Sequence, residues 1–291
     1  MKVSLREKKG FLSISLLIIF QFLFYFFTIL FFYIPYFGLV SEAYSTFYYL
    51  PVLTVIIIIK ILVFLNLVKI LFQKWVSHEE PHYSDIPFLL GFSFYMLISA
   101  KLIDFVLYTT YAITIHGVGF NELFLLNLTK FRYILVLIEL LPPYLIGIYL
   151  YFFRKNLGTR DLKLERIARK NTVIFSIIYI LTVSIIIILL QTIAPFTIIA
   201  GIISLISLSF VVWMFITMYR GKILPEFNSL IISIGFFFYL IFNILFPILM
   251  YSIAQASIEG EAVTTITIEG GTLVSAIIIL IGFKIKARYK V

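Results

Sequence analysis

Four charged side chains lie inside long apolar segments of this chain, where a lipid bilayer holds no water. Lys60 lies in YLPVLTVIIIIKILVFLNLV, Lys101 and Asp104 lie in the next apolar segment, and Glu139 lies in YILVLIELLPPYLIGIYLYFF. A charged residue at the centre of a transmembrane helix costs about 2.5–3.5 kcal/mol on insertion scales. We therefore expect these side chains to face one another or water, and carboxylates in such a place exchange protons or bind cations.

The spacing of the four charges indicates a shared layer. Measured by helical rise from the outer ends of their segments, all four lie about 12–18 Å deep. Lys101 and Asp104 are spaced i, i+3, which places them side by side on one helical face. The same face carries the polar side chains Ser93, Tyr108 and Tyr111, so we expect it to face the interior of a helical bundle.

Two prolines follow polar residues at the same spacing. Pro143 comes four residues after Glu139, and because proline has no N–H the carbonyl of Glu139 loses its helical partner. Asn243 and Pro247 repeat this spacing. Interrupted helices at mid-bilayer depth form ion and substrate sites in many transporters. The candidate pathway residues are therefore Lys60, Lys101, Asp104, Glu139, Pro143 and Asn243.

The composition predicts the helices that would position these residues. Apolar residues make up 62% of the chain and charged residues 13%, which excludes an ordinary soluble domain. Several apolar runs exceed the roughly 20 residues that cross a bilayer as a helix. We predict an all-α, polytopic integral membrane bundle forming one transmembrane domain over residues 1–291. Its eight spans lie near 11–39, 50–73, 86–113, 131–153, 171–193, 196–218, 229–255 and 263–283.

Three features of the sequence test this prediction of eight spans. The apolar stretch 171–218 is too long for one helix, and Gln191, Thr192 and Pro195 mark its turn. Glu269, Gly270 and Gly271 interrupt the outer half of the last span. The basic segment before residue 171 carries apolar residues on one helical face, which predicts a short helix lying on lipid headgroups.

The distribution of basic residues predicts the orientation in the membrane. The net charge is +9, and most of the 23 lysines and arginines lie at the termini and in alternate loops. Because basic loops stay on the cytoplasmic side, both termini are expected in the cytoplasm of a cell-membrane protein. This clustering in short loops argues against nucleic acid as a partner.

The remaining polar motifs predict no cofactor and no metal. The chain has no cysteine, which excludes thiolate ligands and disulfides. His78 and His82 flank Pro81, so a solvated loop is favoured over a metal site. Glu259, Glu261 and Glu269 make the last outer loop acidic; ordinary solvation is the favoured interpretation, and attraction of cations is the alternative.

Function is predicted in two alternative classes. The leading hypothesis is a small transporter or ion-conducting protein that uses the buried charges of spans two to four. The alternative is a non-catalytic membrane subunit of a larger complex, such as an electron-transfer or export assembly. The expected partners are the lipid bilayer and either partner subunits or further copies of the chain. An enzyme would need a site within the bilayer, and the sequence shows none.

Overall fold

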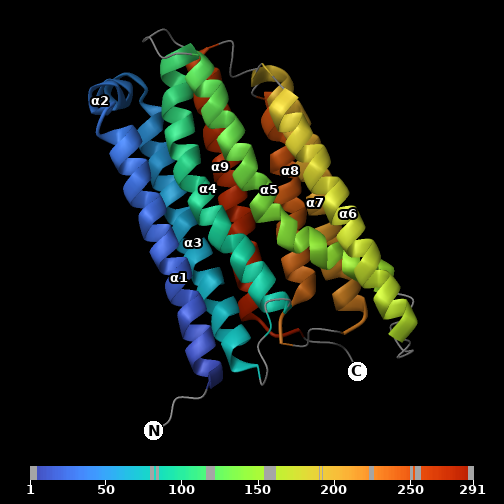
Figure 1. Cartoon of the computed structure of the whole chain (residues 1–291). Helices are drawn as coiled ribbons and strands as arrows, with labels where there is room; N and C mark the ends of the chain where they lie inside the picture. Colours follow the sequence, from blue (N-terminus) through green and yellow to red (C-terminus); the bar gives the residue numbers. More distant parts are fainter. Residues whose placement is uncertain are drawn as a thin grey trace. The chain divides into compact units, whose positions relative to one another are not determined.

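The computed structural model shows an all-helical chain (Figure 1). It describes residues 5–78, 82, 85–115, 122–153, 162–189, 191, 193–222, 226–249, 252 and 257–287. In order, the helices are α1 (Leu5–Thr28), the π-helical turn η1 (Ile29–Tyr33), α2 (Phe37–Thr46), α3 (Tyr49–Ser77), α4 (Ile86–Ile115), α5 (Glu122–Phe153), α6 (Leu162–Leu189), α7 (Ile193–Arg220), α8 (Ser229–Leu249) and α9 (Ile258–Lys284).

Seven segments of the described chain are long and apolar enough to cross a membrane, which confirms a multi-pass membrane protein. They are Ile14–Tyr33, Tyr49–Ser77, Ile86–Thr114, Leu123–Phe152, Lys163–Leu189, Ser229–Leu249 and Ile258–Lys284. The predicted span 196–218 falls on α7, whose described apolar part, Ser204–Arg220, is shorter than the other seven. The count of eight spans therefore stays a prediction.

The helices divide between two compact units, Met1–Leu128 and Thr129–Val291. In the first unit α3 and α4 form an antiparallel hairpin held by aromatic contacts, with the rings of Trp75 and Phe88 at 4.8 Å and those of Phe64 and Phe94 at 5.9 Å. Helix α1 is tied to α4 by two polar contacts. The Tyr95 hydroxyl donates to the carbonyl of Leu17, and Ser99 Oγ donates to Gln21 Oε1 at 2.8 Å.

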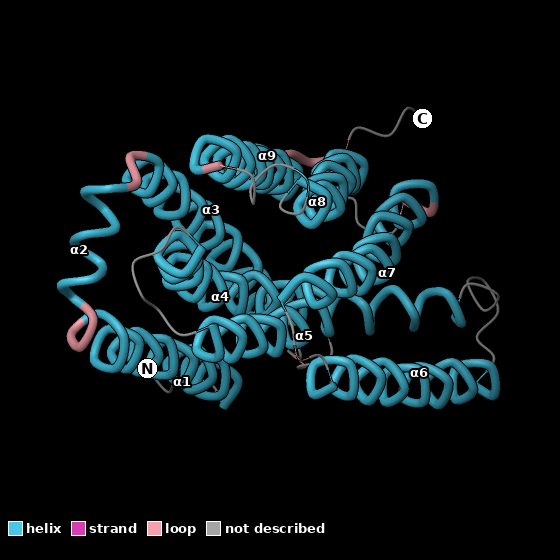
Figure 2. The backbone as a smooth tube through the Cα atoms, turned by 90° about the horizontal axis from the view of Figure 1, so that it is seen from above, coloured by secondary structure: helices cyan, strands magenta, loops and turns pink. Residues whose placement is uncertain are grey.

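The first span ends earlier than its apolar run. The α-helix gives way to η1 at Ile29, and Ile34 to Tyr36 form a turn around Pro35. Helix α2 then crosses from the end of α1 to the start of α3, as Figure 2 shows from above. The Tyr44 hydroxyl lies 2.8 Å from Thr54 Oγ1, which fixes α2 to α3.

The helices of the second unit pack on one another, and α7 contacts α8 as well as α6. Tyr179 of α6 stacks on Tyr144 of α5 with ring centres at 4.3 Å, and its hydroxyl lies 2.9 Å from Ser207 Oγ of α7. Helices α8 and α9 run side by side (Figure 1). Glycines bring them close, because a Cβ at Gly235 would lie 2.9 Å from the backbone nitrogen of Ile279.

Two segments differ from their sequence-based prediction. Residues 164–168 form no separate interfacial helix, because α6 runs without a break from Leu162 through the apolar span. The last span is likewise continuous, since α9 passes through Glu269 and the two glycines after it. The predicted turn after the fifth span is confirmed at Gln191, where the described backbone is not helical. Thr192 lies outside the described residues, and Pro195 lies in the first turn of α7 rather than in the turn before it.

Candidate functional site

The first unit buries an ion pair within α4. Lys101 Nζ lies 2.5 Å from Asp104 Oδ2, and the two side chains are 6% and 8% exposed. The i, i+3 spacing on one helix makes this contact, as the sequence predicted. The neighbouring polar positions of the same face, Ser93, Tyr108 and Tyr111, are also buried. The polar face of α4 therefore points into protein.

Lys60 of α3 is completely buried at the same level as this pair. A Cβ at Gly91 would contact the ring of Phe72, which fixes the register of the α3–α4 hairpin. Lys60 precedes Phe72 on α3 by twelve residues. Because the two helices are antiparallel, the position level with Lys60 on α4 follows Gly91 by about twelve residues, between Lys101 and Asp104. Two ammonium groups and one carboxylate thus lie in one layer of the first unit.

Glu139 belongs to the second unit and has an arginine near it. Its side chain is 5% exposed, and Glu139 Oε2 lies 3.5 Å from Arg132 Nη1. The predicted span 131–153 puts Arg132 at its outer end. In the structure α5 begins earlier, at Glu122, so Arg132 lies well inside the helix, two turns before Glu139. The i, i+7 spacing, which puts both residues on one face, was the available signal.

The predicted proline interruptions lie within helices. Pro142 and Pro143 are inside α5, which bends along its length in Figure 1. Pro247 is buried inside α8, where its ring would contact a Cβ at Gly201 of α7 at 3.0 Å. Asn243 donates its amide to the carbonyl of Tyr239 at 2.8 Å. The side chain of Asn243 thus bonds its own helix.

Helix α9 contains two buried carboxylates that the sequence reading interpreted wrongly as solvated. Glu261 is fully buried and Glu269 is 3% exposed, while Glu259 on the other face is exposed. All three acids belong to the continuous helix α9 rather than to an outer loop. The i, i+8 spacing of Glu261 and Glu269, which places both on one helical face, was the signal that it missed.

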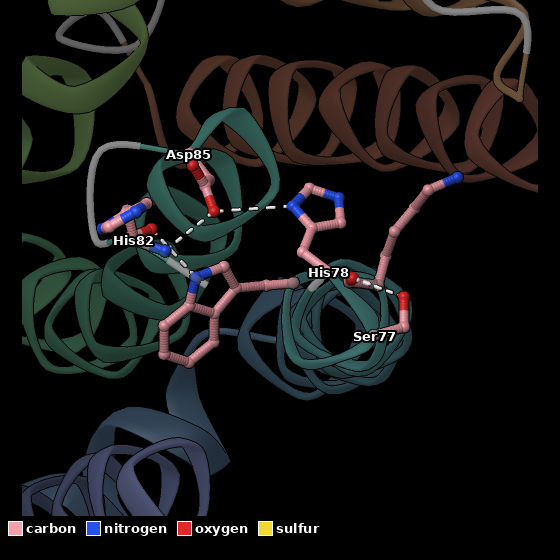
Figure 3. A network of polar contacts seen from close by, with 6 residues as sticks. Ser77, His78, His82 and Asp85 are labelled. Atoms are coloured by element: carbon pink, nitrogen blue, oxygen red, sulfur yellow. Dashed lines mark hydrogen bonds and ion pairs between the residues drawn. The ribbon is translucent and has the colours of Figure 1, made fainter. Parts of the chain in front are cut away.

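The loop between α3 and α4 holds a polar cluster around Asp85 (Figure 3). Asp85 Oδ2 accepts a hydrogen bond from the backbone N–H of His82 at 2.9 Å and lies 3.4 Å from His78 Nδ1. The indole N–H of Trp75 donates to the carbonyl of His82 at 2.9 Å. Within the described part of the chain, no group of three or more histidine, aspartate and glutamate side chains is arranged to hold a metal ion.

The buried charges divide between the two units. Lys60, Lys101 and Asp104 share a layer of the first unit, and Arg132 with Glu139 and the α9 carboxylates belong to the second. Compared with known proteins, the chain matches no family model, no curated protein and no solved structure. The functional argument consequently depends on these residues alone.

Proposed function

We propose that this membrane protein is a small transporter or ion-conducting protein in which Asp104 and Glu139 exchange a proton or bind a cation. The observation that carries the proposal is the 2.5 Å pair of Lys101 and Asp104 inside a membrane span. Ionisable residues within transmembrane segments are rare and mark ion pathways and proton relays.

The chemistry of the first unit supports an exchange at Asp104. A cation or proton that binds the Asp104 carboxylate competes with the ammonium group of Lys101. When it binds, Lys101 is released from Asp104. Lys60 lies at the same level of the first unit and is completely buried. The layer therefore has two arrangements that differ in which cation neutralises Asp104, and a change between them is the step that transport requires.

Glu139 supplies a comparable carboxylate in the second unit. Its oxygen lies within reach of Arg132, and Pro143 leaves the Glu139 carbonyl without a helical N–H donor. A carboxylate and a backbone carbonyl offer the oxygen ligands that small cations prefer. We propose that both termini lie in the cytoplasm of a cell membrane, because the basic residues gather at the termini and in alternate loops.

The proposal is tested in sealed proteoliposomes. Proton influx is followed with an enclosed pH-sensitive dye under a potassium diffusion potential, and sodium uptake is followed with radioactive sodium. Asp104→Asn and Glu139→Gln should abolish the flux that the wild-type chain supports, with the variants eluting as the wild-type protein does in gel filtration. Glu165→Gln, on an exposed pair of α6, is the control that should leave flux unchanged. Equal flux through all four proteins would refute the proposal.

A non-catalytic subunit of a larger membrane complex is the second candidate, and one observation favours it. The most apolar 18-residue stretch of the first membrane span has no residue buried by the rest of the described chain, and Phe22 and Phe31 are 69% and 68% exposed. A partner subunit would cover these apolar side chains as lipid does. Purification in mild detergent separates the candidates: other chains bound in fixed proportion support the subunit, and a chain that emerges alone or with copies of itself supports transport.

A further inference from the structure

Helix α9 carries a buried stripe of oxygen-bearing side chains. Glu261, Thr265, Glu269 and Thr272 follow one another by three or four residues, and none is more than 5% exposed. The stripe lies in a helix that is long and apolar enough to cross a membrane. Glu269 lies about 12 Å further along the axis than Glu261, at 1.5 Å per residue. The stripe therefore runs from one end of a span toward its middle.

Stabilisation of the helix end does not account for the two carboxylates. Ser257 already caps α9, since its Oγ accepts the N–H of Gly260 at 3.0 Å. The exposed Glu259 supplies the first-turn negative charge that favours the positive end of the helix dipole. Glu269 lies far beyond the first turn, where this dipole effect has decayed.

The hydroxyl groups along the stripe present acceptors. Thr265 Oγ1 donates to the carbonyl of Glu261 at 2.8 Å, and Thr272 Oγ1 donates to the carbonyl of Ile268 at 2.9 Å. Each hydroxyl has a single proton, so one that is donated to the backbone leaves only lone pairs for other contacts. Together with the carboxylates, these oxygens form a surface suited to a proton or a small cation.

Thr264 supplies an independent sign of a ligand. It lies one turn after Glu261 on the buried side of α9 and is 1% exposed, yet its Oγ1 finds no hydrogen-bond partner among the described residues. The hydroxyls of Thr265 and Thr272 bond their own helix, whereas the hydroxyl of Thr264, which lies beside the stripe near Glu261, does not. A buried polar group in this state indicates an unseen water or ion beside Glu261.

We infer that α9 carries a second cation site, in which Glu261 and Thr264 receive a proton or a sodium ion and Glu269 holds it deeper in the span. The inference concerns binding and goes beyond the transport role proposed for Asp104 and Glu139. Proton or sodium binding at the α9 carboxylates decides this inference, and the result of the flux experiments does not affect it.

Carbodiimide labelling of the purified full chain tests the inference. N,N′-dicyclohexylcarbodiimide is an apolar reagent that modifies carboxyl groups in their protonated form, and peptide mass spectrometry identifies the modified residue. Labelling of Glu269 should fall at least fivefold between about pH 5 and about pH 9, since a carboxyl that releases its proton stops reacting. Labelling that is absent at Glu261 and Glu269, or independent of both pH and sodium, would overturn the inference.

Two arms of the experiment distinguish the ligands. At a fixed pH, sodium chloride should protect Glu269 from the reagent when the site binds sodium, and choline chloride should not. Protection by neither salt, with the pH dependence kept, assigns the site to protons. Each result supports the cation site and names its occupant.

Variants on the same helix provide matched controls. Glu261→Gln and Thr264→Val should each slow the labelling of Glu269 several-fold, because both change the receiving end of the stripe. Glu259→Gln changes an acid two residues away on the exposed face and should leave the labelling of Glu269 unchanged. Equal slowing by Glu259→Gln would show a general charge effect and overturn the assignment. Wild-type labelling decides the question even where a variant fails to fold.

Discussion

Lys101 and Asp104 form a 2.5 Å ion pair within one turn of α4, with both side chains less than a tenth exposed. Desolvation offsets much of the attraction in such a pair, so it adds little stability over a well-packed apolar pair. Removing one partner is different, because it leaves a charge buried without its compensating ion. Single and double substitutions should therefore behave very differently.

We expect Lys101→Met and Asp104→Leu each to lower the free energy of unfolding by about 3–5 kcal/mol. The double variant should recover most of this loss, since it removes both charges together. Thermal unfolding of the detergent-purified proteins measures the three changes. Single variants as stable as the wild-type chain would show that water or another group compensates each charge.

An exposed pair of similar length is the matched control. Arg169 Nη2 lies 2.6 Å from Glu165 Oε1 on α6, but the two side chains are 71% and 31% exposed. Solvent screening reduces such an i, i+4 pair to about 0.3–0.5 kcal/mol. Arg169→Ala should therefore change stability far less than Lys101→Met, although the distances that join the two pairs are nearly equal.

Close packing of α8 against α9 gives a second prediction. A Cβ at Gly235 would lie 2.6 Å from Ile279 Cγ1 and 2.9 Å from the Ile279 backbone nitrogen, whereas a Cβ at Gly270 would meet nothing within 4 Å. Gly235→Ala should destabilise the protein by about 1–3 kcal/mol, because backbone atoms must move. Gly270→Ala should instead stabilise it by about 0.5–1 kcal/mol through helix propensity. Equal effects would contradict the packing.

The elements of the fold were largely predictable from the apolar runs. Hydropathy located α3, α4 and α8 because a membrane span is defined by the length of its apolar segment. The ends were less predictable. The run before Val40 stays apolar although the chain turns at Pro35, and α6 extends into polar sequence as far as Leu162. Hydropathy measures burial in lipid, whereas hydrogen bonding sets where a helix ends.

The candidate site was predictable where both partners lie one turn apart. Lys101 and Asp104 were paired from their spacing, and the structure makes that contact. The two α9 carboxylates were missed because the glycines beside Glu269 suggested a break. A Cβ at Gly271 would lie 2.2 Å from the ring of Phe242, so this glycine serves close helix packing. Only tertiary contacts distinguish such a glycine from a helix breaker.

Tyr44 of α2 should make stability depend on pH above neutrality. Burial raises the pKa of its hydroxyl above the ordinary value for tyrosine, although hydrogen bonds to Thr54 and Thr109 act in the opposite direction. The folded state thus holds the proton more tightly than the unfolded state. This contribution is complete below about pH 10 and is lost as the pH rises through the folded-state pKa. Unfolding of the wild-type chain and of Tyr44→Phe across about pH 8–11 measures it. The same decline in both proteins would assign it to other groups.

Asp85 should stabilise the turn between α3 and α4 through its carboxylate. Its Oδ2 accepts the backbone N–H of His82, and its carbonyl accepts the N–H of Leu89 at 3.0 Å at the start of α4. Asp85→Ala removes the acceptor and should cost about 0.5–1.5 kcal/mol, as loss of a hydrogen bond does. Asp85→Asn keeps an oxygen at this position and should cost less. Thermal unfolding ranks the two variants, and an equal loss would show that the charge near His78, rather than the hydrogen bond to His82, stabilises the turn.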